Sequence, residues 1–431
     1  YNIYSSEWPV ANRAIELYLQ KKSENEGWER QINGLSNNEK ANLLLEKHTF
    51  KELLADVEQR NLQNNIVGLE ASRLFARSEI NMGVDAFRDS LYAMLKRNTF
   101  LNIKFENMLD TLGEMSRTDL YSYLKEWEQL TPLPFYSIGE PELTKVVNKG
   151  GEEFFVLKVL VSNNSDYDGI IQMNVLQNGW WYQPMEDPRA RKKVEIAAHT
   201  SKEFVSVWEE QIRDVEINTM VSGNLPYMIR QSIGNVKQER NKIVKDTIYT
   251  LPESSLEMPG EVIVDNEDST LFVLSTPAVV GLLPKWLDKV EDTSFKYSGI
   301  SWWRAPLQWT ATTNAKYYGK YIRSAYVIKS GDGSQTATWK IPVPEAGQYE
   351  LYYHVFKDDE LRWNDRLQGE YHFRVAYDSE MEDAYINLRK ANEGWEQLGT
   401  YYFSADTVRV VLTDECKLRS VTADAVKIVK R

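Results

Sequence analysis

A chain of 431 residues exceeds what one ordinary hydrophobic core holds, so its length predicts two or three domains. Hydrophobic residues make up 42% of the chain and charged residues 26%, a balance typical of folded soluble proteins and not of disordered ones. The net charge is −12 and lysine and arginine form no cluster, which argues against nucleic acid and against an anionic membrane surface as partners.

The first third of the chain carries helical signals. Ser36 and Glu39 have the spacing of a capping box, which predicts a helix that runs on to Val57. Apolar residues then recur at helical spacing within residues 84–95 and again within residues 105–112. These segments predict a helical bundle.

The bundle is expected to end at a pair of prolines. Ser116 has the position of an N-cap for a last helix that carries Trp127. Pro132 and Pro134 cannot continue a helix and stop it. We therefore assign residues 1–134 to a helical domain.

A β-rich region follows. The apolar, β-branched segments are separated by polar turns, and the two that flank His199 look like a hairpin. Strands are predicted at residues 153–161, 169–177, 194–197 and 203–208. Short strands of this kind indicate an immunoglobulin-like β-sandwich over residues 135–255.

A stretch rich in proline and serine, residues 251–260, has the composition of a linker. Beyond it, Tyr349 to Val355 alternate between apolar and polar positions, the pattern of a strand with one buried face. Other strands are predicted at residues 336–341, 371–377, 399–403, 407–412 and 425–429. The predicted fold class is α+β and multi-domain, a helical bundle followed by two mainly antiparallel β-sandwiches, the second over residues 256–431.

The chain carries no recognisable catalytic or metal-binding motif. None of the histidines is paired at a spacing that would place two zinc ligands on one helical face; they are His48, His199, His354 and His372. The single cysteine, Cys416, lies beside two carboxylates that would raise the pKa of a thiol, and it has no disulfide partner. We predict no catalytic residue, no metal and no cofactor, and interpret the acidic segment 265–268 as a solvated turn.

The C-terminal region resembles a known module. Its motifs are Val262-Ile-Val-Asp-Asn266, Ala337-Thr-Trp339-Lys340, Pro344-Glu-Ala-Gly347-Gln-Tyr349, Gly394-Trp395-Glu-Gln-Leu398-Gly399 and Val421-Thr-Ala423-Asp424-Ala425. In this order they resemble the C-terminal module of golvesin and of bacterial xanthan lyases, which is classed as carbohydrate-binding-like. The resemblance implies a glycan-binding type of β-sandwich in a secreted or surface protein. Between Asp268 and Gly319 this chain has a longer segment than the family.

The N-terminal region resembles the part of gluzincin aminopeptidases that follows their zinc motif. The stretches that carry this resemblance are Met82 to Phe87, Phe105 to Leu109, Asp119 to Tyr123 and Trp127 to Pro134. That motif does not occur in this chain, so the resemblance transfers no catalytic residue. It implies instead the downstream part of a larger, peptidase-like protein. The chain begins at Tyr1 without a methionine, and we expect it to be trimmed or partial.

A glycan would be expected to bind where the chain departs from the family. Trp302, Trp303 and Trp309 lie close together in sequence with Arg304 and Gln308. Indole rings stack on the C–H faces of sugar rings, while arginine and glutamine hydrogen-bond hydroxyl groups. The alternative interpretation is that these tryptophans fill one end of the sandwich.

Trp339 and Trp395 lie within strand or turn motifs and are predicted to belong to the core.

Three functions compete. The first is a non-catalytic extracellular, periplasmic or cell-surface protein that binds a glycan or surface polymer through its C-terminal sandwich. The others are a fragment of a metallopeptidase-like protein whose zinc site lies outside the chain, and a structural spacer.

Overall fold

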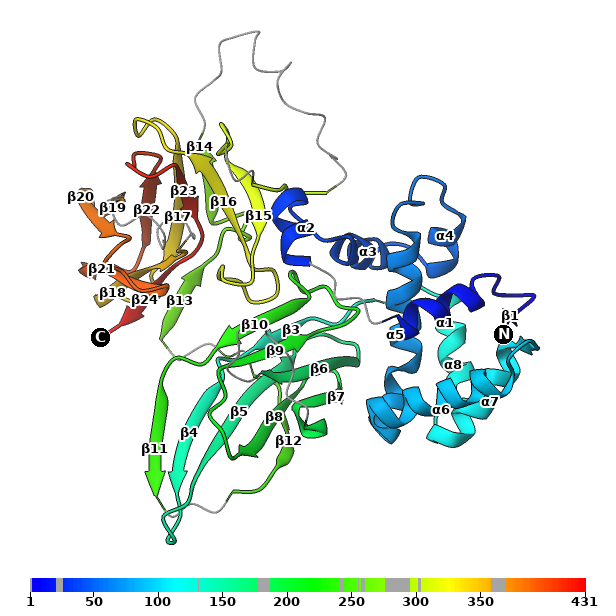
Figure 1. The fold of residues 1–431 in the computed structure, drawn as a ribbon. Helices are drawn as coiled ribbons and strands as arrows, with labels where there is room; N and C mark the ends of the chain where they lie inside the picture. The colour runs from blue at the N-terminus through cyan, green and yellow to red at the C-terminus, as the bar shows by residue number, and fades with distance from the viewer. Residues whose placement is uncertain are drawn as a thin grey trace. The chain divides into compact units, whose positions relative to one another are not determined.

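Figure 1 shows the computed structural model, which describes residues 2–20, 26–130, 132–176, 187–240, 244–254, 256, 260–275, 295–300, 304–357 and 369–431. The chain forms two compact units. The first unit comprises residues 1–24 and 37–256, and the second comprises residues 25–36 and 257–431. The helical region and the first β region, predicted as separate domains, thus lie in one unit. Helix α2 (Glu26–Asn33) lies within the residues of the second unit.

The helices of the first unit are α1 (Ala11–Leu19), α3 (Asn37–Leu45), α4 (Phe50–Ala55), α5 (Gln63–Met82), α6 (Val84–Arg97), α7 (Phe105–Ser116) and α8 (Leu120–Lys125), with a parallel pair β1 (Asn2–Tyr4) and β2 (Asn102–Lys104). The helix predicted from Ser36 to Val57 is instead two helices, α3 and α4. The reason is a second capping box: the Thr49 hydroxyl accepts from Glu52 N at 3.1 Å, and Thr49 N donates to the Glu52 carboxylate at 2.9 Å. This box starts α4 afresh.

The last helix also begins differently from the prediction. Ser116 is not its cap, because Ser116 is the last residue of α7 and its buried hydroxyl lies 2.8 Å from that of Ser78. The N-cap of α8 is Asp119, whose side chain accepts from Ser122 N at 3.1 Å. Helix α5 was not predicted, since it is buried on several sides and includes the buried carboxylates Glu70 and Glu79, which blur a single apolar stripe.

Two sheets follow in the first unit. One has the order β11–β4–β5–β8–β12, with β3 on β5, and the other the order β10–β9–β6–β7. The strands are β3 (Tyr136–Ile138), β4 (Glu142–Val147), β5 (Glu153–Asn163), β6 (Gly169–Leu176), β7 (Arg191–Ile196), β8 (Thr200–Trp208), β9 (Asp214–Asn218), β10 (Met228–Ser232), β11 (Val236–Arg240) and β12 (Thr247–Pro252). One core joins them, with Leu157 of β5 and Ile171 of β6 both fully buried in it. The hairpin predicted around His199 is wrong: β7 pairs with β6 and β8 with β5, so the turn crosses between sheets.

The second unit contains β13 (Glu261–Val264), β14 (Phe272–Ser275), β15 (Thr310–Thr313), β16 (Ser324–Lys329), β17 (Thr336–Pro342), β18 (Gly347–Val355), β19 (Glu370–Tyr377), β20 (Glu380–Asn387), β21 (Gly394–Phe403), β22 (Thr407–Thr413), β23 (Ser420–Ala423) and β24 (Val426–Lys430). Its strands form three sheets over the described residues: β13–β24–β18–β21, β14–β17–β22–β19–β20 and β15–β16–β23. All these pairings are antiparallel. The predicted helical start and mainly antiparallel remainder are confirmed, but this unit is not strictly a two-sheet sandwich.

His199 connects its own turn to two other loops of the first unit through hydrogen bonds. His199 lies between two carboxylates, with Nε2 2.8 Å from Asp166 Oδ1 and Nδ1 2.7 Å from Glu253 Oε2. These hydrogen bonds raise the pKa of His199 above its ordinary value of 6.5. The hydrogen bond with Asp166 has the larger effect and that with Glu253 the next largest.

The raised pKa predicts a pH-dependent contribution to stability. Because the protonated ring is favoured in the folded state, its contribution is fully present below pH 6.5 and is lost as the pH rises through the folded pKa. We expect an NMR titration of His199, identified by His199→Gln, to give a pKa above 6.5 that falls in Asp166→Asn. A pKa at or below 6.5 in the wild type would contradict this contact.

Candidate functional site

The structure places the predicted ligand-binding residues as follows. Trp302 and Trp303 lie outside the described residues. Arg304 and Gln308 are exposed. Trp309 is only 8% exposed and packs in the core of the second unit, so its ring has little free face. Binding at this segment stays a prediction.

The two tryptophans assigned to the core differ from each other. Trp339 is completely buried on β17, as predicted. The core assignment of Trp395 is wrong: it is half-buried, and it lies at the start of β21, the last strand in its sheet.

Strand register explains which residues surround Trp395. Along β18, Tyr349, Leu351, Tyr353 and Val355 are buried, so the residues between them point to the other face of the sheet. On that outer face, His354 lies opposite Trp395 of β21, and Tyr352 lies opposite Lys427 of β24. Three neighbouring strands therefore bring aromatic and basic side chains together on one face.

The rings on this face contact one another. The centroid of Trp395 is 5.1 Å from that of His354 and 5.0 Å from that of Tyr318, which comes from the loop between β15 and β16. Lys427 Nζ lies 4.8 Å from the Trp395 centroid and 5.4 Å from that of Tyr352, the geometry of cation–π contacts. We call these five residues the Trp395 cluster.

A buried carboxylate supports the cluster from below. Asp424 is fully buried, and its carboxylate oxygens accept from Tyr318 N at 3.1 and 3.2 Å. His354 Nδ1 lies 2.8 Å from Asp424 Oδ2. Burial raises the pKa of Asp424, and the adjacent His354 opposes that rise. Asp424 thus positions both the Tyr318 loop and the His354 ring.

The cation of the cluster is also held in place. Lys427 Nζ is 2.6 Å from Glu261 Oε1 on the neighbouring strand β13, and both side chains are largely buried. The Tyr352 hydroxyl donates to Glu350 at 2.6 Å. These contacts hold the side chains of the cluster in place, so the cluster is preorganised.

Sequence reasoning assigned none of these residues to a site. The alternation along residues 349–355 already placed Tyr352 and His354 on the outward face. The aromatic residues at the outward positions of this strand were the signal that could have found them. No local pattern connects them to Tyr318, which precedes His354 by a long stretch of chain.

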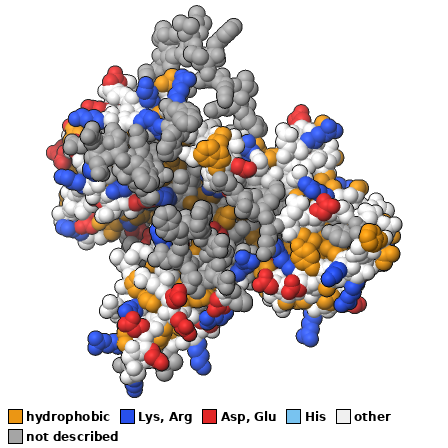
Figure 2. All heavy atoms as spheres, in the orientation of Figure 1, with side chains coloured by type: hydrophobic (Ala, Val, Ile, Leu, Met, Phe, Trp, Pro, Cys, Tyr) orange, Lys and Arg blue, Asp and Glu red, His pale blue; other side chains and the backbone are white. Residues whose placement is uncertain are grey.

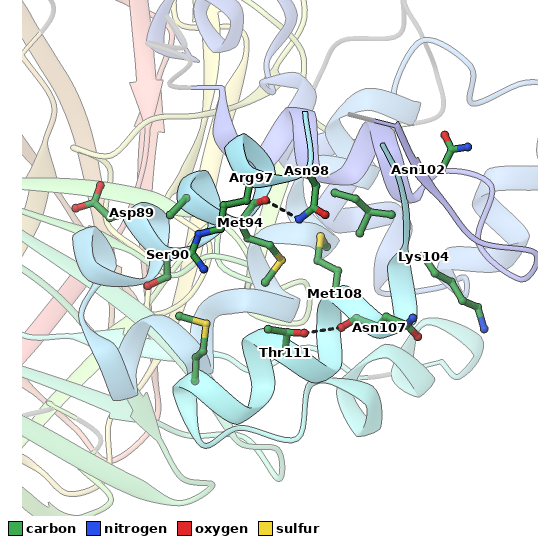
Figure 3. Close-up of a pocket in the computed structure, with 13 residues that line it drawn as sticks. Asp89, Ser90, Met94, Arg97, Asn98, Asn102, Lys104, Asn107, Met108 and Thr111 are labelled. Atoms are coloured by element: carbon green, nitrogen blue, oxygen red, sulfur yellow. Dashed lines mark hydrogen bonds between the residues drawn. The ribbon is translucent and has the colours of Figure 1, made fainter. Parts of the chain in front are cut away.

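A concave surface lies between α6 and α7 in the first unit, with a volume of about 680 Å³ (Figure 3). Met94 and Met108 line it from the two helices, together with Arg97 of α6 and Lys104 of β2. Near it, Phe100 and Met115 are exposed, and hydrophobic side chains gather over the helical region in Figure 2. Its polar side chains include Thr111, whose hydroxyl donates to Asn107 O within α7 at 2.9 Å.

The acidic segment 265–268 is a structured turn. Asp265 N donates to Asp268 Oδ2 at 2.8 Å, and Glu267 pairs with Lys296 at 2.5 Å and accepts from the Tyr297 hydroxyl at 3.1 Å. Within the described ranges, no group of three or more histidine, cysteine or acidic side chains is arranged to hold a metal ion. The turn is thus explained by contacts within it and with residues 296–297. The prediction of a solvated turn is wrong for Asn266, which is buried.

Acidic and basic side chains are interspersed over the face that Figure 2 shows. In the part of the chain that the structure describes, no helix combines the length and the apolar composition needed to cross a membrane.

Comparison with known families identifies one region. Residues 303–430 match the Golvesin C-terminal domain, which confirms the resemblance predicted for the C-terminal region. The matched range contains all five residues of the Trp395 cluster together with Asp424. No curated protein matches the chain. The resemblance of the N-terminal region to aminopeptidases stays a prediction.

Several solved structures align with the chain at low similarity. A xanthan lyase from Paenibacillus is 16% identical, with 70% of this chain and 27% of that chain covered and a TM-score of 0.28. A β-glucuronidase from Bacteroides uniformis is 10% identical, with 72% and 31% covered and a TM-score of 0.20. An exo-β-1,3-galactanase from Phanerochaete chrysosporium is 5% identical, with 67% and 68% covered and a TM-score of 0.24. The chain spans less than a third of the first two, and TM-scores this low do not establish a common fold.

Proposed function

We propose that the Golvesin-type region binds a glycan through the Trp395 cluster. The observation that carries the proposal is the outward sheet face on which the rings of Trp395, Tyr318 and His354 lie within 6 Å of one another, beside Lys427. Aromatic faces pack against the C–H faces of pyranose rings, and an imidazole can donate a hydrogen bond to a hydroxyl group. A half-buried, preorganised set of rings binds at a low cost in conformational entropy.

Binding without catalysis is part of this proposal. Cleavage of a glycosidic bond generally uses two carboxyl groups that both reach the bond. The carboxylates that contact the cluster are already engaged within the protein. Asp424 is fully buried beside His354, and Glu261 is paired with Lys427. Glu350 accepts from the Tyr352 hydroxyl and is paired with Arg431. We also propose that the protein acts outside the cytoplasm, as a secreted or surface protein, because the match to the Golvesin C-terminal domain supports a role with extracellular polymers.

A glycan array tests the proposal. We expect the purified wild-type chain to bind a subset of glycans, and Trp395→Ala and Tyr318→Ala to lose that binding while both keep cooperative unfolding. The matched control is Trp28→Ala on α2, since Trp28 is 57% exposed and lies outside the cluster. Wild-type binding that survives both cluster substitutions would refute the assignment of the site, and an array with no hits would refute glycan binding.

A further inference from the structure

A cavity of about 240 Å³ lies in the first unit, where α1, α3, α5 and α6 meet β6, β7, β9 and the segment after β9. We call it the α5 cavity. Its size is below the roughly 300–1,000 Å³ of sites for drug-sized ligands, so it suits a single-ring or similarly small molecule. The side chains that line it and that are used below are Tyr18, Asn38, Asn64, Asn65, Arg88 and Lys193.

The cavity carries an excess of positive charge. Among the described residues, Glu79 is the only carboxylate within 4.0 Å of either Lys193 or Arg88, and it faces both: it pairs directly with Lys193 Nζ and lies 3.9 Å from Arg88 Nε. The Glu79 side chain is fully buried and that of Lys193 is 7% exposed. One carboxylate thus faces two cations. The Arg88 side chain is 26% exposed, but its Nε is buried without a hydrogen-bond partner. A buried donor atom of a cationic group that lacks a hydrogen-bond partner favours an anion at that position.

The rest of the cavity is lined by neutral hydrogen-bonding groups and by apolar side chains such as those of Leu69 and Met220. The Asn65 amide donates to Asn38 Oδ1 at 2.8 Å, and the Asn38 amide donates to the Tyr227 hydroxyl at 3.1 Å. Asn64 is exposed at the surface, where its Oδ1 accepts from Arg13 Nε at 3.0 Å. Carboxamides both donate and accept hydrogen bonds, so a row of them matches the hydroxyl groups of a polyol.

We infer that the α5 cavity binds a small polyhydroxylated carboxylate, that is, a sugar acid of monosaccharide size. The carboxylate would meet Arg88 beside the Lys193–Glu79 pair, and the hydroxyl groups would meet the carboxamides of Asn38 and Asn65. The site lies in the first unit and is independent of the Trp395 cluster, so either can fail without the other.

Isothermal titration calorimetry of the full chain tests the inference, with D-glucuronate, D-galacturonate and D-gluconate as probes and D-glucose and acetate as comparators. We expect at least one sugar acid to bind with a Kd of about 1 mM or tighter, and both comparators to bind at least about tenfold more weakly. Arg88→Gln should weaken binding at least about tenfold, because it removes a charged donor. Arg97→Gln is the matched control, since Arg97 is on the same helix but lines the surface between α6 and α7.

A second variant keeps the test decisive if Arg88→Gln does not fold. A Cβ at Gly68 would meet only Leu17 Cβ, at 3.8 Å, so Gly68→Leu should place its side chain in the cavity and abolish binding while the chain still folds. Failure of all three sugar acids to bind would overturn the inference. So would equal binding of D-glucose, or wild-type affinity in folded Arg88→Gln or Gly68→Leu.

Discussion

Replacing Glu79 by alanine is expected to lower the free energy of unfolding of the first unit by about 3–5 kcal/mol, the cost of leaving a buried charge without its partner. Glu79 is fully buried on α5, where it pairs with Lys193 of β7 and accepts from the Tyr18 hydroxyl of α1 at 2.8 Å. One carboxylate thereby links the helical layer to a strand of the sheet. Its removal leaves Lys193, itself nearly buried, with no carboxylate in reach among the described residues.

Urea denaturation of matched variants measures this effect. The control is Glu16→Ala, which breaks the exposed Arg13–Glu16 pair and should cost no more than about 1 kcal/mol. The double variant Glu79→Leu/Lys193→Met should recover much of the stability lost in Glu79→Ala, because it removes both charges together. A loss below about 1 kcal/mol in Glu79→Ala would contradict the role of the pair.

Replacing Trp339 by alanine is expected to destabilise the second unit by about 3–5 kcal/mol. Its ring is completely buried and lies 5.4 Å from Phe272 and 6.1 Å from Tyr353, centroid to centroid. Its Nε1 donates to the main-chain oxygen of Asp424 at 3.1 Å, so the substitution removes a hydrogen bond to the residue that supports the Trp395 cluster.

Differential scanning calorimetry measures the effect of Trp339→Ala. Trp28→Ala is the matched control, because a 57% exposed tryptophan should contribute within about 0.5 kcal/mol. Equal melting temperatures for the two variants would show that Trp339 is not part of the core.

Much of the second unit could be predicted from its sequence, because its strands carry strong local signals. The alternation along residues 349–355 predicted both the strand β18 and its buried face. The region that resembles golvesin was recognisable from dispersed motifs, and the match over residues 303–430 confirms it. The burial of Trp339 follows from its place on β17 between β14 and β22.

The errors arose where tertiary contacts decide between local alternatives. Serine and aspartate are both good N-cap residues. Because the Ser116 hydroxyl is buried against that of Ser78, Asp119 is the N-cap of α8. The turn at His199 has the composition of a hairpin, but its two strands pair with different neighbours. Pairing across sheets depends on the whole core and not on the turn.

The candidate site was the least predictable part. Trp395 lies in a motif with a tight turn, which favoured a core position, yet β21 is the last strand of its sheet and Trp395, near its start, is only half-buried. Tyr318 joins it through Asp424, a contact between residues far apart in the chain. Such a cluster is formed by register and a buried carboxylate, neither of which leaves a sequence pattern.

The most direct test of the central claim is an isothermal titration of the tightest array ligand into the wild-type chain and into Trp395→Ala, side by side. A central aromatic residue of a binding site contributes about 2 kcal/mol or more when it is truncated. We therefore expect the dissociation constant of Trp395→Ala to rise at least about tenfold. Trp28→Ala should match the wild type. An unchanged dissociation constant in a folded Trp395→Ala variant would contradict the Trp395 cluster as the glycan site.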